Sequence, residues 1–254
     1  MFYIIVFILG SIWGSFANVC IHRLPIGESI VIKRSYCPKC NEKIKWFNNI
    51  PLISFLILGG KCKSCKSGID KRYFIVELTS VINFLFIYHF FGLSITSILL
   101  AMLSIFFIII FFIDLKHYII PNELTYLLMV IGFLKSFDPN LNVNLFPNLI
   151  NSLIGGCFGY TIIWLIIFVY KKLRNKEGMG LGDAKLLSAI GFWFGWVSIP
   201  FIIFFSSLIA LISAIPDLIK NKKNLSSQIP FGPYIIIGNL IFLIVFDYIK
   251  LFLG

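Results

Sequence analysis

The chain has 254 residues, of which 59% are hydrophobic, 17% are aromatic and only 13% are charged. A mean hydropathy of +0.94 excludes an ordinary soluble domain, and repeated apolar runs indicate helices that cross a bilayer. A net charge of +11 would suit nucleic acid, but cytoplasmic loops of membrane proteins also retain Lys and Arg. We therefore expect contact with membrane lipid and no nucleic-acid partner.

The first apolar segment, residues 2–20, has the position of a signal peptide but not its composition. It lacks a basic region before the apolar run and a small-x-small cleavage site. Gly10 and Gly14 are instead typical of a face that packs against another helix. The segment is predicted to be a retained first membrane span.

Residues 21–73 are predicted to form a cytoplasmic insert with a metal site. Cys37-Pro-Lys-Cys40 and Cys62-Lys-Ser-Cys65 are separated by 21 residues, which is the spacing of a zinc ribbon with four thiolate ligands. Such a closed site is structural, and an insert this small needs a cross-link such as a metal ion to hold its fold. A pair of disulfides is the alternative, although stable disulfides are rare in the reducing cytoplasm.

The remaining apolar runs predict seven further spans, which gives an all-α polytopic membrane protein with about eight transmembrane helices. We expect three regions, namely the first helix (1–20), the cysteine insert (21–73) and a helical bundle (74–254). The predicted spans are 2–20, 74–91, 95–113, 122–137, 149–170, 185–198, 200–219 and 233–253.

The positions of the basic residues predict the orientation of these spans. With the N-terminus outside, four loops face the cytoplasm, and they hold 20 of the 22 Lys and Arg residues. These loops are 21–73, 114–121, 171–185 and 217–232. Only Lys135 and Lys250 fall at the other face, as the positive-inside rule requires.

Two aspartates stand out among the 11 acidic residues because they lie at predicted span ends. Asp114 closes the apolar run 95–113, and Asp183 lies where a helix should begin. Asp114 could be a solvated boundary residue beside Lys116, and Asp183 could be a helix N-cap. Together they suggest a carboxylate pair at one membrane depth, in which one keeps its proton as general acid while the other activates water.

Other residues receive simpler interpretations. Gly178, Gly180 and Gly182 precede Asp183 and would let a substrate backbone approach it without side-chain obstruction. Cys20 and Cys157 lie in apolar spans and are interpreted as buried packing residues.

The motifs match a known family. They are GSFANVCIHRLPIGESI (14–30), the cysteine quartet, NNIPLISFLILGGKC (48–62), RYFIVEL (72–78), IPNELT (120–125) and GMGLGDAKLLSAIG (178–191). In this combination, over nearly its whole length, the chain resembles the bacterial prepilin peptidases, or type IV leader peptidases.

The resemblance implies an aspartic endopeptidase of the bacterial inner membrane, with its active site at the cytoplasmic face. Such enzymes remove the short basic leader from type IV pilin or pseudopilin precursors, and Asp114 and Asp183 match their catalytic pair. The insert with its cysteine quartet implies a second activity, N-methylation of the new N-terminus with S-adenosylmethionine. The resemblance does not identify the residues for methyl transfer, and Glu28, Glu77 and Asn48–Pro51 are candidates. Many members have Pro-Asp where this chain has Pro121-Asn122.

Two other function classes agree less well with the sequence. A transporter could use the two aspartates as an ion site, but transport sites lie near the membrane midplane rather than at span ends. A zinc ribbon on a passive membrane anchor would need neither eight spans nor two acids at the membrane edge. A His-Glu-x-x-His motif for metal-dependent proteolysis is absent from the sequence.

Overall fold

The computed structural model describes residues 2–31, 35–141, 145–175, 179–219 and 229–253, without the side chains of 216–219 and 247–253. Helices account for all named elements of the described chain. They are α1 (Phe2–Arg23), η1 (Leu24–Ile26), η2 (Trp46–Asn48), α2 (Ile53–Ile57), α3 (Lys71–Phe91), α4 (Ile95–His117), α5 (Asn122–Lys135), α6 (Leu149–Arg174), α7 (Leu181–Phe194), α8 (Ser198–Ile219) and α9 (Gly232–Leu253). Outside the described residues lie Gly178 and several basic residues of the charge count, namely Lys33, Arg34, Lys176, Lys220, Lys222 and Lys223.

Each predicted span corresponds to one long helix, which confirms the all-α fold. The main difference concerns α7, which begins at Leu181 rather than at residue 185 and ends at Phe194. It ends there because Gly195 has a φ of +79°. Pro200, the first residue of the predicted span 200–219, lies in the first turn of α8, where a missing backbone N–H costs no helical hydrogen bond.

Five helices of the described chain are long and apolar enough to cross a membrane, namely α1, α3, α4, α6 and α8. The chain is therefore a multi-pass membrane protein. Helices α5 and α7 have 14 residues each, about 21 Å of helix against a hydrocarbon core of about 30 Å. The described apolar part of α9 covers Gly232–Phe246. A count of eight spans stays a prediction.

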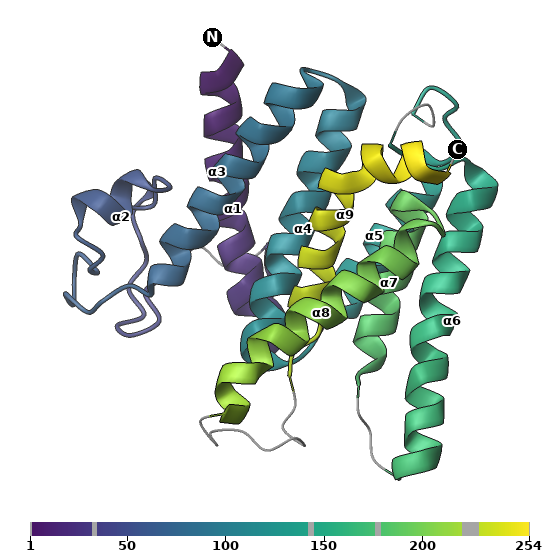
Figure 1. Cartoon of the computed structure of the whole chain (residues 1–254). Coiled ribbons are helices and arrows are strands. Elements are labelled where there is room, and N and C mark those ends of the chain that lie inside the picture. The colour runs from purple at the N-terminus through teal and green to yellow at the C-terminus, as the bar shows by residue number, and fades with distance from the viewer. Residues whose placement is uncertain (1, 32–34, 142–144, 176–178, 220–228, 254) are drawn as a thin grey trace. The chain divides into compact units, whose positions relative to one another are not determined.

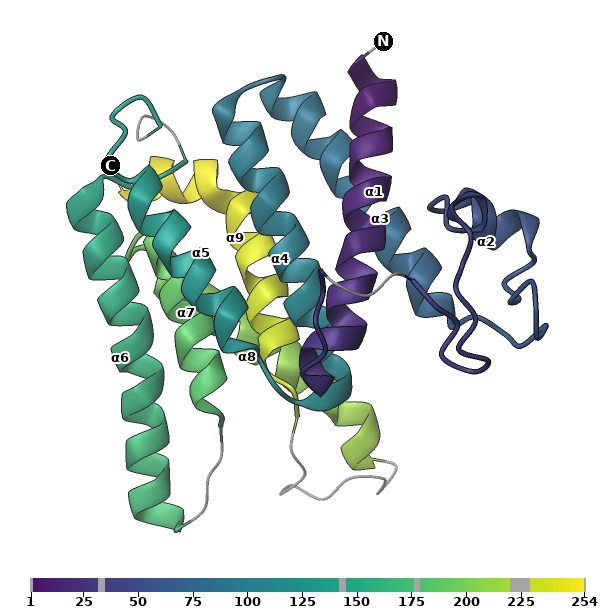
Figure 2. The same ribbon diagram turned by 180° about the vertical axis from the view of Figure 1, so that it is seen from behind.

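The chain divides into two compact units, Met1–Ile109 and Ile110–Gly254. In unit 1, α1 packs along α3, and the two helices lie side by side in both views (Figures 1 and 2). A Cβ atom on Gly14 would lie 2.8 Å from the Cα of Glu77, and one on Gly10 would lie 2.9 Å from the Cα of Val81. The two glycines therefore permit the close approach of α1 to α3, as their spacing predicted.

In unit 2, α7 is the most buried helix and packs against α5 and α6 (Figure 1). A side chain at Gly191 would collide with the Gly155 carbonyl of α6. Trp193 is fully buried, and its indole N–H donates to the Leu128 carbonyl of α5 over 2.8 Å. Both contacts fix the position of α7, whose first turn carries Asp183.

Two expectations about single residues need correction or detail. Cys20 is buried as expected, but Cys157 is exposed. The prediction for Cys157 was wrong because the hydropathy of a span does not show which face of the helix packs. Lys135 is only 6% exposed, and its ammonium lies 4.4 Å from the ring centre of Phe146 and 5.7 Å from that of Trp193. This cation–π arrangement offsets part of the cost of burying the charge.

Candidate active site and metal centre

Asp114 lies near the C-terminal end of α4, within unit 2, and is only 4% exposed. Its Oδ2 atom accepts a hydrogen bond of 2.9 Å from the backbone N–H of Gly232 at the start of α9. A solvated boundary residue would not be buried in this way, so that alternative is wrong. The hydrogen bond gives the carboxylate a defined orientation.

Asp183 lies in the first turn of α7 and is 8% exposed. The N-cap of this helix is Gly180, so the N-cap alternative for Asp183 is also wrong. The Asp183 carboxylate instead contacts the Gly180 backbone amide. A carboxylate at this position also faces the positive end of the helix dipole.

The structure brings the two predicted aspartates together in one unit, from helices about 70 positions apart in the chain. Their carboxylates are close enough to interact electrostatically. Ile120 packs beside Gly182 and Gly232, since a Cβ on Gly182 would lie 3.1 Å from the Ile120 Cβ and one on Gly232 would lie 3.1 Å from its Cδ1. Two buried carboxylates at short range cannot both ionise, so such a pair holds one acid and one base.

The predicted glycines differ in their surroundings. Gly182 packs against Ile120, so a substrate does not occupy that side of it. A Cβ on Gly180 would meet only the Gly182 nitrogen at 3.8 Å and the Asp183 Oδ2 at 3.9 Å. Space beside the carboxylate is therefore open at Gly180.

Sequence reasoning missed two contacts of this site. Gly232 was not singled out, although Pro230 and Pro233 around it mark the start of a helix. The second is a 2.7 Å hydrogen bond from the Lys185 ammonium to the Asn122 Oδ1. Asn122 at the start of α5 is therefore a hydrogen-bond partner of α7.

The four cysteines of the predicted quartet lie together in unit 1. Their Sγ atoms are all within 4.8 Å of one another, and those of Cys37 and Cys65 are 3.9 Å apart. In a tetrahedral site with Zn–S bonds of about 2.3 Å, the sulfurs are about 3.8 Å apart. The donor set and its spacing therefore fit a zinc ion.

The two Cys-x-x-Cys segments have the same local fold. In each, the first cysteine accepts a backbone hydrogen bond four residues on, from Asn41 to Cys37 and from Lys66 to Cys62. Asn41 and Lys66 have φ values of 56° and 57°. Each Cys-x-x-Cys segment, called a knuckle below, thus makes the same tight turn, which presents two sulfurs on one side.

Crowding of the four thiols affects their protonation. The Ser67 hydroxyl, 3.0 Å from the Cys65 sulfur, lowers the pKa of that thiol to about 6. A backbone contact to Glu42 lowers the pKa of Cys40, but burial and hydrogen bonds with the other three thiols outweigh it and raise that pKa to about 12. Four adjacent thiols can all lose their protons only if a cation offsets the repulsion between the thiolates, and a metal ion would supply that charge.

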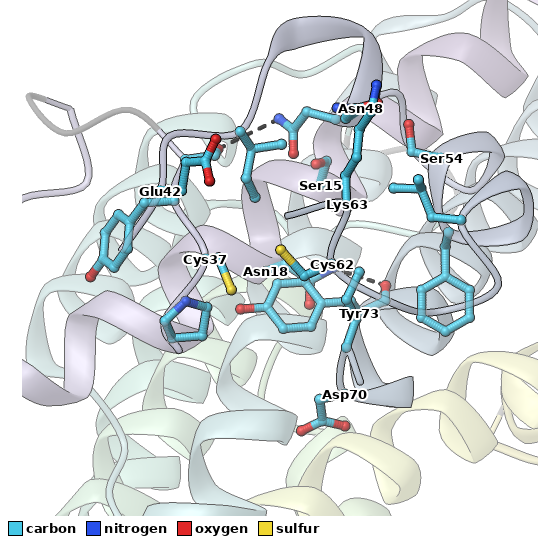
Figure 3. A pocket seen from close by; sticks show the side chains of 18 of the residues that line it. Ser15, Asn18, Cys37, Glu42, Asn48, Ser54, Cys62, Lys63, Asp70 and Tyr73 are labelled. Carbon is cyan, nitrogen blue, oxygen red and sulfur yellow. Dashed lines mark hydrogen bonds between the residues drawn. The ribbon is translucent and has the colours of Figure 1, made fainter. Parts of the chain in front are cut away.

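Beside the knuckles, unit 1 contains a cavity of about 470 Å³ (Figure 3). Of the residues considered for methyl transfer, Glu77, Asn48, Asn49 and Ile50 line this cavity. Glu28 is not among its lining residues, and its carboxylate accepts a hydrogen bond from the Tyr36 hydroxyl.

Two family models match separate parts of the chain. A family model described as the bacterial peptidase A24 N-terminal domain matches residues 8–91. A model described as the type IV leader peptidase family matches residues 101–215, a segment that holds both aspartates. No solved structure matches the chain.

Several curated relatives carry the name prepilin leader peptidase/N-methyltransferase. The relative from Vibrio cholerae is 38% identical over 98% of this chain and 98% of its own length. The relative from Pseudomonas aeruginosa is 34% identical over 93% of this chain and 88% of its own length. That from Aeromonas salmonicida is 33% identical over 96% and 91%. The chain therefore belongs to the type IV leader peptidase family.

Proposed function

We propose that this protein cleaves the basic leader from type IV pilin or pseudopilin precursors and then methylates the new N-terminal amine. The observation that carries the peptidase assignment is the pair of buried carboxylates, Asp114 and Asp183, in one unit. The names of the relatives support both activities.

In the proposed peptidase reaction the two aspartates share one proton. The ionised carboxylate takes a proton from water, which attacks the carbonyl carbon of the scissile bond. The protonated carboxyl group donates to the carbonyl oxygen and so stabilises the developing negative charge. The carboxyl group that took the proton of water then gives it to the amide nitrogen, and the C–N bond breaks to release the amine. The Gly232 N–H holds the Asp114 carboxylate in place, and the open space at Gly180 admits the substrate backbone.

Cys37, Cys40, Cys62 and Cys65 are the proposed ligands of a structural zinc ion. Four protein ligands leave no open coordination position, so this metal would organise the insert and take no part in the chemistry. S-adenosylmethionine is the proposed methyl donor, and it supplies an activated methyl group on a sulfonium ion.

We place the protein in the bacterial inner membrane with the insert and both aspartates toward the cytoplasm. The support is the distribution of Lys and Arg in the sequence. The burial of both acids among apolar helices supports a hydrolytic pair, and no observation among the described residues favours the ion-transport alternative.

The test of the peptidase assignment uses purified full-length protein in detergent with a pilin precursor. Asp114→Asn and Asp183→Asn should each lower the cleavage rate by about 10²–10⁴-fold, because Asn keeps the size of Asp but cannot exchange a proton. Asp138→Asn is the matched control, since Asp138 lies in the same unit and bonds Asn140. Mass spectrometry of the product reads leader loss and methylation in one spectrum. Cleavage that survives either substitution would contradict the aspartate pair.

A further inference from the structure

The cavity of unit 1 is enclosed by three parts of the chain. The C-terminal half of α1 forms one wall, the first turns of α3 form a second, and the cysteine knuckles with the segment between them form the third (Figure 3). Two of the knuckle cysteines, Cys37 and Cys62, are among its lining residues. Its volume of about 470 Å³ lies within the range of small-molecule sites, roughly 300–1,000 Å³.

Asn18 on the α1 wall has a buried acceptor without a partner. The residue is 2% exposed, and its side-chain amide donates 2.9 Å to the Tyr73 carbonyl of α3. That bond fixes the orientation of the side chain, while its Oδ1 atom has no hydrogen-bond partner. A buried acceptor left unsatisfied is costly, so a donor from a bound molecule would complete this wall.

Glu77 on the α3 wall is also a lining residue of the cavity, and the Ser15 side chain hydrogen-bonds its carboxylate. It is 8% exposed, and its Oε2 accepts a 2.7 Å hydrogen bond from the Leu52 N–H. Leu52 has a φ of +61° and is the central residue of a γ-turn closed by the Ile53 N–H and the Pro51 carbonyl, 2.6 Å apart. Such turns are rare and strained, and the hydrogen bond to the Glu77 carboxylate stabilises this one.

The rest of the lining carries charges of both signs. Glu42 and Asp70 add negative charge, and four lysines add positive charge, namely Lys39, Lys43, Lys45 and Lys63. A ligand with both a cationic and an anionic group would find partners here. S-adenosylmethionine has this character, because it carries a carboxylate, an ammonium group, a sulfonium ion, two ribose hydroxyls and the adenine amino group.

We propose that this cavity is the methyl-donor site, with the Glu77 carboxylate facing the sulfonium end of the ligand and the Asn18 Oδ1 accepting from one of its N–H groups. The proposal rests on the methyl-transfer part of the proposed function. It places methyl transfer in unit 1 and peptide cleavage in unit 2.

The reaction in this site balances without a further reagent. The new N-terminal ammonium first loses a proton to water. The amine lone pair then attacks the methyl carbon, the S–CH₃ bond breaks, and its electron pair stays on sulfur. The products are the methylated ammonium and neutral S-adenosylhomocysteine. Asn18 and Glu77 bind the donor and are not assigned a proton transfer.

Calorimetric titration of the purified full-length protein with S-adenosylmethionine and with S-adenosylhomocysteine tests the site. Glu77→Gln should weaken binding of the sulfonium ligand by about 10–100-fold and binding of the neutral thioether much less, since only the former carries charge on sulfur. Asn18→Leu should weaken both by about 3–10-fold. Ser80→Ala and Ser11→Ala are matched controls on α3 and α1, because these buried hydroxyls bond carbonyls of their own helices and are absent from the cavity lining.

The contrast between the two ligands separates recognition from a structural role. Equal weakening of both by Glu77→Gln would show that the carboxylate only holds the Leu52 turn, and would overturn the proposal. Unchanged binding in both variants, with methylation intact, would also overturn it. A wild-type protein that cleaves precursors but neither binds the donor nor methylates would instead contradict the methyl-transfer part of the proposed function.

Discussion

The two units of the chain position their functional side chains by different physical means. In unit 2 the aspartates lie on long helices whose contacts are made by glycines and large apolar side chains, such as Gly191 and Trp193. In unit 1, α1 and α3 pack in a similar way, but the segment between them is mostly exposed and organised around the four cysteines. One site therefore depends on helix packing, and the other depends on packing together with the cysteine cluster.

This difference has a consequence for how the two activities can be lost. Damage to the cysteine cluster should affect the cavity, because two of its cysteines form part of the cavity wall. Asp114 and Asp183 are instead held by backbone amides within unit 2. We therefore expect that each activity can be lost while the other is retained.

Metal removal should have the largest effect. A strong chelator, or Cys40→Ser combined with Cys65→Ser, should abolish donor binding and methylation, because small inserts of this type lose their fold without the metal. Leader cleavage should continue. Zinc release, donor titration and cleavage are the three measurements, and Cys157→Ser is the control because Cys157 is exposed on α6. Equal loss of both activities would contradict the separation of the two sites.

The second-largest effect is expected from replacing one tightly packed glycine in each unit by alanine, because each variant should lower only the activity of its own unit. Gly191→Ala places a methyl group against the Gly155 carbonyl, and Gly14→Ala places one 2.8 Å from the Glu77 Cα. Overpacking of this kind costs about 1–3 kcal/mol. The first should lower cleavage and the second donor binding, with both seen as a lower Tm. Thr161→Ala on α6, whose hydroxyl donates to carbonyls of its own helix, should leave both activities unchanged.

Displacement of one carboxylate should give an intermediate effect. A Cβ at Gly232 would lie 2.7 Å from the Asp114 Oδ2, so Gly232→Ala pushes the carboxylate away from its hydrogen-bond donor. A displacement of about 1 Å can cost about 10²-fold in rate, and we expect cleavage to fall by about 10–100-fold. Donor binding by the same variant is the internal control. A wild-type cleavage rate would show that the Gly232 contact does not orient the catalytic group.

The smallest effect is expected at Asn122. Asn122→Asp replaces the hydrogen bond with Lys185 by an ion pair, and both residues are solvent-accessible. Such exposed pairs contribute about 0–1 kcal/mol, so the Tm and the cleavage rate should change little. If this variant altered cleavage as strongly as Gly232→Ala, Asn122 would have to contact the substrate directly.

Several features could be predicted from the sequence because each depends on residues close together in the chain. Apolar runs predicted the main helices of the described chain, and the cysteine spacing predicted a cluster that the structure brings together. Asp114 and Asp183 were found because acids are rare in this composition. The limits of α7 were misjudged, since Gly195 ends the helix and Pro200 lies in the first turn of the next helix, which begins at Ser198.

Other features could not be predicted because they depend on partners far apart in the chain. Asp114 meets the Gly232 amide 118 residues away, and Asn18 meets the Tyr73 carbonyl 55 residues away. The exposure of Cys157 was likewise misjudged, because hydropathy does not distinguish the face of a helix that packs from the face that does not.

The sequence by itself determined the class of the protein, the candidate metal-ligand set and the two candidate catalytic acids, because hydropathy, cysteine spacing and rare acids are local properties. Only the tertiary structure decided which polar groups face one another. The burial of the two aspartates, the unpartnered Asn18 oxygen and the cavity beside the knuckles all arise where helices approach closely, and that approach is set by packing of distant segments.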